Sequence, residues 1–149
     1  MKKRFFAVLL AIFSVVLLIT GCQKQYVDYS LRQDRENVVK IEICSYEDAT
    51  RTRTPIVELS EDDSQQLLTE FSNMTCMKYF PGDHPRDYGI VLFCIYYADG
   101  EIEVIGESNI GWISSDGTWN LTDYTFDYAE MKKVIQHYVP EEFQPTWID

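Results

Sequence analysis

The chain has 149 residues, a formal net charge of −11 and a hydrophobic content of 46%. This length predicts one domain of ordinary size. The acidic balance argues against nucleic acid as a partner, because a phosphate backbone is bound by a basic surface. The high content of apolar and aromatic residues excludes a wholly disordered chain.

Residues 1–21 have the composition of a secretion signal. Three basic residues at positions 2–4 precede an uncharged apolar stretch from Phe5 to Ile19. This stretch is shorter than the roughly 18–20 residues that cross a bilayer as a helix. We therefore leave residues 1–21 out of the fold and expect their removal. The mature protein would then have 128 residues, ten basic against 24 acidic, and a net charge of −14.

The leader ends in Ile19-Thr20-Gly21-Cys22: an aliphatic residue, a small residue, glycine and cysteine. This run resembles the lipobox of bacterial lipoproteins. The resemblance implies acylation of the Cys22 thiol with palmitate-type chains and cleavage after Gly21. Acyl chains stabilise membrane attachment by about 0.8 kcal/mol per buried methylene. We therefore expect a lipoprotein of the cell envelope, anchored at the extracytoplasmic face of the cell membrane. An uncleaved anchor helix and an ordinary secreted protein are the alternatives.

The next segment, residues 22–36, is polar and lacks a clean periodicity. We expect it to be the lipid anchor followed by a flexible tether. Its apolar residues leave open that part of it packs on the domain; they are Tyr26, Val27, Tyr29 and Leu31. Residues 37–149 are predicted to form a single domain.

The first half of this domain contains two strands and a helix. Alternation over residues 38–46 predicts a half-buried strand, with Cys44 on its solvent side. Its inward side chains are expected to be Val39, Ile41 and Ile43. A polar loop over residues 47–55 and a short strand over residues 56–59 follow. Ser60 is a predicted N-cap, because the next residues are acidic and then apolar at helical spacing.

The second half is richer in strands. Residues 75–80 form a short strand or extended segment, and residues 90–97 a strand buried on both faces. An Asp-Gly turn leads to a strand over residues 101–105, and residues 110–113 pair with 119–122 as a hairpin. Asp127 begins a final helix that ends before Pro140; its expected buried stripe is Tyr128, Met131, Ile135 and Tyr138, with Val134 beside it. The order predicts an α+β domain: an antiparallel sheet of about five to seven strands with two helices packed on one face.

Two surfaces are candidates for binding a partner. The loop Pro81–Gly89 is irregular and carries chemically useful side chains, namely Asp83, His84 and Arg86. The other candidate is the hairpin bearing Trp112 and Trp119, because tryptophan is favoured in recognition surfaces. The leading hypothesis is therefore a non-catalytic binding or interaction module at the cell envelope. Its acidic and aromatic character would suit a basic protein or a basic ligand.

Catalysis has little support in the sequence. There is no nucleophile motif, no glycine-rich phosphate loop and no paired-histidine frame, so we predict no catalytic site, metal or cofactor. One alternative is an envelope hydrolase or metal-dependent enzyme centred on Asp83, His84 and Asp87. Another is a structural or accessory subunit of an envelope complex. One internal disulfide is possible, but spacing selects no pair among Cys44, Cys76 and Cys94.

Overall fold

The computed structural model describes residues 25–47, 49–78, 89–107 and 109–148. Within these residues, six antiparallel strands form the larger sheet, in the order β3-β2-β5-β6-β7-β8, and three form a smaller sheet, in the order β1-β4-β9. The larger sheet comprises β2 (Val38–Glu47), β3 (Thr52–Glu58), β5 (Val91–Tyr97), β6 (Ile102–Gly106), β7 (Ile110–Ile113) and β8 (Trp119–Leu121). The smaller sheet comprises β1 (Tyr26–Asp28), β4 (Thr75–Lys78) and β9 (Tyr124–Phe126).

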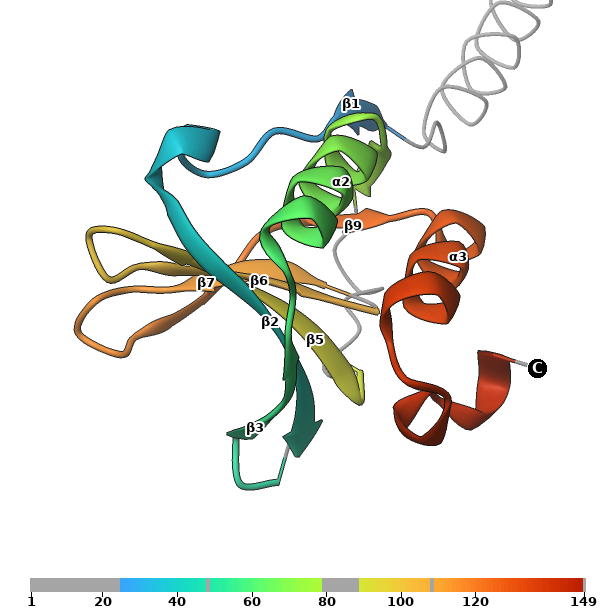
Figure 1. Ribbon diagram of the computed structural model, residues 1–149. Helices are drawn as coiled ribbons and strands as arrows, with labels where there is room; N and C mark the ends of the chain where they lie inside the picture. The colour runs from blue at the N-terminus through green and yellow to red at the C-terminus, as the bar shows by residue number, and fades with distance from the viewer. Residues whose placement is uncertain (1–24, 48, 79–88, 108, 149) are drawn as a thin grey trace, which may run out of the picture.

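Two helices, α2 (Glu61–Ser72) and α3 (Tyr128–Tyr138), pack on one face of the larger sheet (Figure 1). Single turns of 3-10 helix occur at Arg35–Asn37 (η1), Glu141–Phe143 (η2) and Thr146–Ile148 (η3). The expected α+β class, with an antiparallel sheet and both helices on one face, is confirmed.

Both α-helices begin where the sequence predicts. The Ser60 hydroxyl accepts a hydrogen bond from the Asp63 N–H at 3.1 Å, and it donates to the Asp63 carboxylate at 2.6 Å. The Asp127 carboxylate accepts the Ala129 N–H at 2.9 Å. Each cap satisfies a backbone donor that the first helical turn cannot satisfy itself. The expected stripe of α3 is buried except for Tyr128, which is exposed on the first turn.

The core between the helices and the sheet is built around Phe71 of α2. Its ring stacks on Phe126 of β9 with 5.3 Å between ring centroids, and meets Phe93 of β5 edge-on at 5.7 Å. Tyr29 approaches the same ring edge-on at 6.2 Å. Aromatic pairs at these separations add stability beyond the area they bury. This cluster joins both sheets and α2 into one core.

The sequence prediction fails at two places in the first hairpin. The pairing of β2 with β5 shifts register between Val38 and Lys40, so Val39 is 66% exposed instead of facing inward. Strand β3 begins at Thr52, within the stretch expected to be a loop, and pairs with the end of β2. In both cases pairing with a neighbouring strand decides the outcome, and the local alternation of residues does not contain that information.

The opposite face of the larger sheet is buried without covering helices. Cys44, expected on a solvent-facing side, packs there with Leu92, Val104 and other apolar residues. Trp119 of β8 lies 5.7 Å from Tyr46 of β2, measured between ring centroids. The two strands are four positions apart in the sheet, which is about 19 Å if the sheet is flat. The sheet must therefore be strongly coiled, with this face on the inside.

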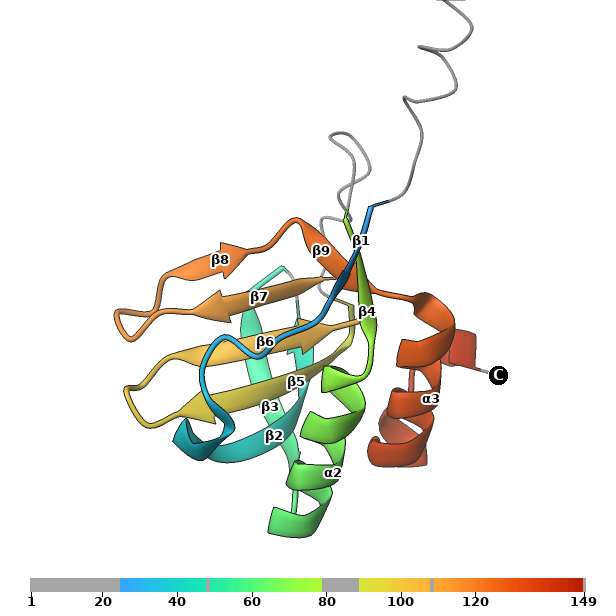
Figure 2. The same cartoon turned by 90° about the horizontal axis from the view of Figure 1, so that it is seen from above.

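Residues 25–37, here called the strap, run across the helix-bearing face of the larger sheet (Figure 2). Strand β1 pairs with β4, and the following residue, Tyr29, is buried. Arg35 then donates hydrogen bonds to the α2 residues Leu68, Thr69 and Ser72. The sequence prediction of a flexible tether is thus wrong for residues 25–36, which belong to the folded domain.

Candidate functional site

A pocket lies where the strap crosses the ends of β6 and β7. Its volume is about 470 Å³, within the range of small-molecule sites. Apolar side chains on two sides of it come from Val27 and Leu31 of the strap and Ile110 of β7. Trp112 and Tyr124 add aromatic surface. The pocket therefore combines a largely apolar lining with a few polar groups, as ligand sites usually do.

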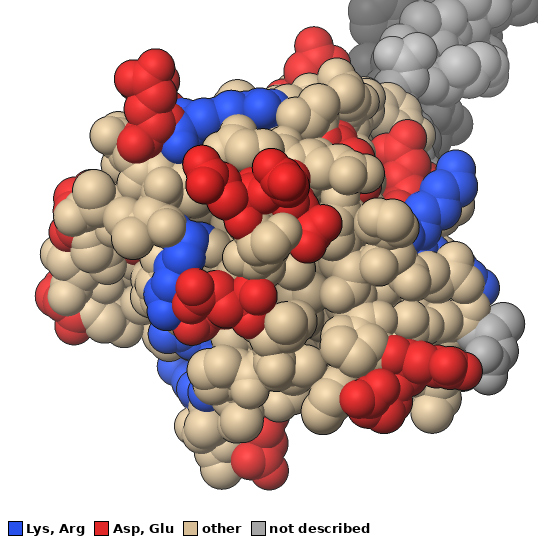
Figure 3. Space-filling view, viewed as in Figure 1, with Lys and Arg blue, Asp and Glu red and all other residues tan. Residues whose placement is uncertain are grey.

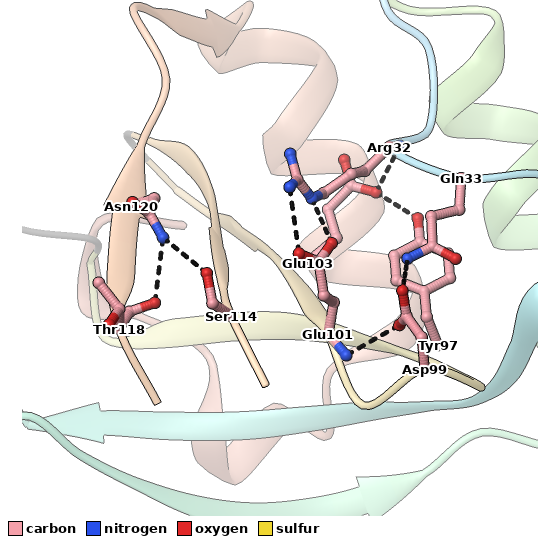
Figure 4. A network of polar contacts seen from close by, with 9 residues as sticks. All are labelled: Arg32, Gln33, Tyr97, Asp99, Glu101, Glu103, Ser114, Thr118 and Asn120. Carbon is pink, nitrogen blue, oxygen red and sulfur yellow. Dashed lines mark hydrogen bonds and ion pairs between the residues drawn. The ribbon is translucent and has the colours of Figure 1, made fainter. Parts of the chain in front are cut away.

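The polar centre of this region is Glu103 of β6, which is only 4% exposed. Its Oε1 accepts the Tyr29 hydroxyl at 2.5 Å. Its Oε2 accepts the Arg32 N–H at 3.0 Å and the Tyr97 hydroxyl (Figure 4). Two of the three donors belong to the strap. A buried carboxylate is tolerated only when such donors replace its water. Glu103 therefore holds the strap against the sheet.

An outer ring of polar contacts surrounds this buried carboxylate. The Arg32 guanidinium forms a two-point ion pair with Glu101, at 2.6 and 3.2 Å, and lies 4.1 Å above the centre of the Trp112 ring. The hydrogen bond from Arg32 is the main cause that lowers the pKa of Glu101. Gln33 donates to Asp99 at 2.7 Å. These contacts fix the strap beyond the pocket, at the turn between β5 and β6.

The thiol of Cys76, which lines the pocket, is a poor nucleophile at neutral pH. Burial, assisted by the charge of Glu103, raises the pKa of this thiol to about 12. A thiol with that pKa is almost entirely protonated at neutral pH, and the thiolate is the nucleophile. Burial and then Glu103 also raise the pKa of the Tyr29 and Tyr97 hydroxyls, which remain hydrogen-bond donors.

The structure separates the two tryptophans that the sequence analysis grouped together. Trp112 lies opposite Asn120 and Trp119 lies opposite Ile113, so the two rings point to opposite faces of the sheet. Trp112 lines the pocket, while Trp119 lies on the inner face beside Tyr46 and Arg53. Asn120, which follows Trp119 in the chain, donates hydrogen bonds to the Ser114 hydroxyl and the Thr118 carbonyl at the hairpin turn (Figure 4).

The other predicted site residues, Asp83, His84, Arg86 and Asp87, lie outside the described residues. Among the residues that are described, no group of three or more His, Cys, Asp or Glu side chains is placed to hold a metal ion. No helix in the described ranges is long and apolar enough to cross a membrane.

Sequence reasoning missed Glu103, the residue on which the site depends. The alternation of residues 101–105 assigns the two glutamates to the solvent side. In the folded chain Glu101 is on that side, at the edge, whereas the strap covers Glu103. The sequence does contain one indication of this contact: the strap carries apolar residues, above all Tyr29. A solvated tether does not require such residues, so they indicate that the segment packs on the domain.

The hydrogen bond from Tyr29 can be removed without changing the shape of the ring. We expect Tyr29→Phe to lower the free energy of unfolding by about 1.5–3 kcal/mol, because it removes a bond to a buried charge. Tyr26→Phe is the matched control; Tyr26 is 59% exposed, so a change below about 0.5 kcal/mol is expected. Urea unfolding measures both values, and equal effects would contradict the assigned role.

The same hydroxyl predicts how stability changes in alkali. The folded pKa of Tyr29 is above its unfolded value of about 10. The contribution of the Tyr29 hydroxyl to the free energy of unfolding is therefore complete below about pH 10. It decreases as pH rises from there towards the folded pKa of Tyr29. We expect the difference in unfolding free energy between wild type and Tyr29→Phe to be constant from pH 7 to about 9.5 and to narrow above pH 10. A difference that is unchanged at pH 11 would refute this linkage.

Comparison of the chain with protein-family models, with curated proteins and with solved structures finds no match in any of the three.

Proposed function

We propose that this protein is a lipid-anchored, extracytoplasmic binding module whose ligand occupies the pocket between the strap and β7. The observation that carries the proposal is the pocket itself: about 470 Å³, aromatic and apolar in lining, and built around a fully hydrogen-bonded carboxylate. The Cys76 thiol in its lining has a pKa of about 12 and is therefore a poor nucleophile at neutral pH. Non-catalytic binding is the function that this combination supports best.

The charges around the pocket indicate the chemistry of the ligand. Asp28 and Glu103 line it, and Arg32, which also lines it, forms an ion pair with Glu101. Acidic side chains also predominate on the face drawn in Figure 3, in several separate groups. A cationic ligand is attracted by such a field and an anionic one is repelled. We therefore propose a small ligand with an apolar or aromatic body and a positively charged end.

The position of the strap relates this pocket to the proposed lipid anchor. Val27 lines the pocket and follows Cys22 by five residues. Five residues span at most about 18 Å. Lipidation at Cys22 would therefore hold the pocket near the membrane surface, because the strap is part of the folded domain and adds no length to the tether.

Lipidation is tested by replacing the acceptor cysteine. We expect the wild-type chain, expressed in a bacterial host, to incorporate a palmitate analogue and to enter the detergent phase on Triton X-114 partitioning. Cys22→Ala should lose the label and move to the aqueous phase or retain its uncleaved leader, while the neighbouring control Gln23→Ala behaves like wild type. Palmitate labelling that survives Cys22→Ala would rule out this anchor.

Ligand chemistry is tested with two probes of one shape and opposite charge, phenethylamine and phenylacetate. Saturation-transfer NMR on the full chain in detergent should show phenethylamine binding with a dissociation constant on the order of 1 mM. Phenylacetate should bind about tenfold more weakly, because its charge has the wrong sign.

Blocking variants locate the bound probe. Ser30 lines the pocket and is exposed, so Ser30→Trp should fill the opening and abolish saturation transfer. Ser115→Trp places the same ring on an exposed turn outside the pocket and should have no effect. Equal binding of the two probes, or binding that persists in Ser30→Trp, would contradict the proposed site.

A further inference from the structure

The inner face of the larger sheet holds two buried cysteines that take no part in the pocket. Cys44 of β2 is 1% exposed and Cys94 of β5 is 0% exposed. Cys44 lies opposite Leu92, and Cys94 opposite Glu42, so the cysteines are diagonal neighbours on one face of a strand pair. Both side chains belong to the buried cluster on this face. The fold thus brings together two thiols that are 50 residues apart in the sequence.

A cation is aimed at one of these two sulfurs. Arg53 of β3 is partly buried, and its Nη1 lies 3.6 Å from the Cys94 Sγ. The same guanidinium lies 5.6 Å from the centre of the Trp119 ring, which covers this end of the inner face. A guanidinium in contact with sulfur stabilises the thiolate over the thiol. Cys94, and not Cys44, therefore has the environment of an attacking sulfur.

The electrostatics of the pair support this asymmetry. The hydrogen bond from Cys44 lowers the pKa of Cys94; burial opposes this, and the charge of Arg53 adds to it. The pKa of Cys44 is raised, by that same hydrogen bond first and then by burial. One sulfur is thus the better thiolate, and its neighbour retains a proton. Thiol–disulfide exchange needs this division of roles.

The third described cysteine has a different position. Cys76 of β4 belongs to the core between the sheet and the helices, whereas Cys44 and Cys94 belong to the cluster on the inner face. Of the three possible pairs among these described cysteines, only Cys44 and Cys94 belong to the same cluster.

We propose that Cys44 and Cys94 form a dithiol–disulfide couple that exchanges with small disulfide compounds, with Cys94 as the attacking sulfur and Cys76 as a bystander. The couple is separate from the ligand pocket and does not depend on the proposed binding function. It also selects one disulfide pairing where the cysteine spacing left three open.

The exchange is balanced with glutathione disulfide as the oxidant. The Cys94 thiolate attacks one sulfur of the oxidant, forming a mixed disulfide and releasing one glutathione thiolate. That thiolate takes the proton of Cys44, whose sulfur then displaces the second glutathione thiolate. Two protein sulfurs are oxidised and one glutathione disulfide is reduced. The protein sulfurs must approach each other to about 2.05 Å, and a diagonal pair across two strands needs a local backbone movement to reach this distance. Since both are enclosed in the folded chain, we place the exchange in a transient opening of the inner face that leaves Arg53 beside Cys94.

The test is refolding in a redox buffer, with no membrane or ligand present. The full chain carrying Cys22→Ser, in detergent, is unfolded and reduced, then refolded at a series of ratios of reduced to oxidised glutathione. Free thiols are alkylated, and the peptides are identified by mass spectrometry. Under oxidising ratios we expect a peptide linked through Cys44 and Cys94, with Cys76 alkylated. Three alkylated cysteines at every ratio, or a link that includes Cys76, would overturn the proposal.

Single-cysteine variants test the assigned roles. Cys44→Ser should accumulate the mixed disulfide with glutathione on Cys94, because the resolving sulfur is gone, whereas Cys94→Ser should leave Cys44 mostly alkylated. Arg53→Met should slow formation of the linked peptide several-fold, and Arg51→Met, on the exposed turn before β3, should not. Glutathione trapped on Cys44 in preference to Cys94, or equal rates for the two arginine variants, would contradict the roles even if the link forms.

Discussion

The buried carboxylate of Glu103 is the constraint that organises the functional half of this molecule. A charge that is 4% exposed requires donors in place of water, and two of its three donors come from Tyr29 and Arg32 of the strap. The strap must therefore cross β6 at one position. That crossing forms one wall of the pocket, places Arg32 over Trp112, and makes residues 25–36 part of the domain. Removing one of the three hydrogen-bond donors destabilises the fold for the same reason, because the carboxylate remains buried.

The two faces of the larger sheet carry separate chemistry because of the strand pleat. Successive side chains alternate, so Trp112 faces the pocket and Trp119 faces the coiled interior. The same alternation on β5 directs Tyr97 to Glu103 and Cys94 to Arg53. A substitution on one face is therefore expected to change the contacts of that face and to leave those of the other face in place. The coil of the sheet buries the second face without a helix, which is how a domain of this size acquires two clusters of buried residues.

Local features of the fold could be predicted from the sequence, and features that depend on distant contacts could not. The caps Ser60 and Asp127 and the doubly buried strand β5 follow from residues within one or two turns of each other. Glu103 looks solvent-facing until the strap, 71 residues earlier at Arg32, is placed above it. The contact between Cys44 and Cys94 depends on the register of β2 with β5, which cysteine spacing does not reveal. The proposed extracytoplasmic location rests on the sequence of residues 1–22, and the proposed ligand class rests on the charges that folding collects around the pocket.

The central structural role of Glu103 is to hold the strap against the sheet. Amide hydrogen exchange tests this role most directly. In Glu103→Gln the carboxylate becomes an amide, which has one acceptor oxygen for three donors. We predict faster exchange in β1 and in the amides of residues 29–33, while the amides of α2 and α3 stay protected. The control Glu58→Gln, at an exposed position, should leave the exchange rates unchanged. Unchanged protection of residues 29–33 in Glu103→Gln would contradict the account, because the strap would then be held by its other contacts alone.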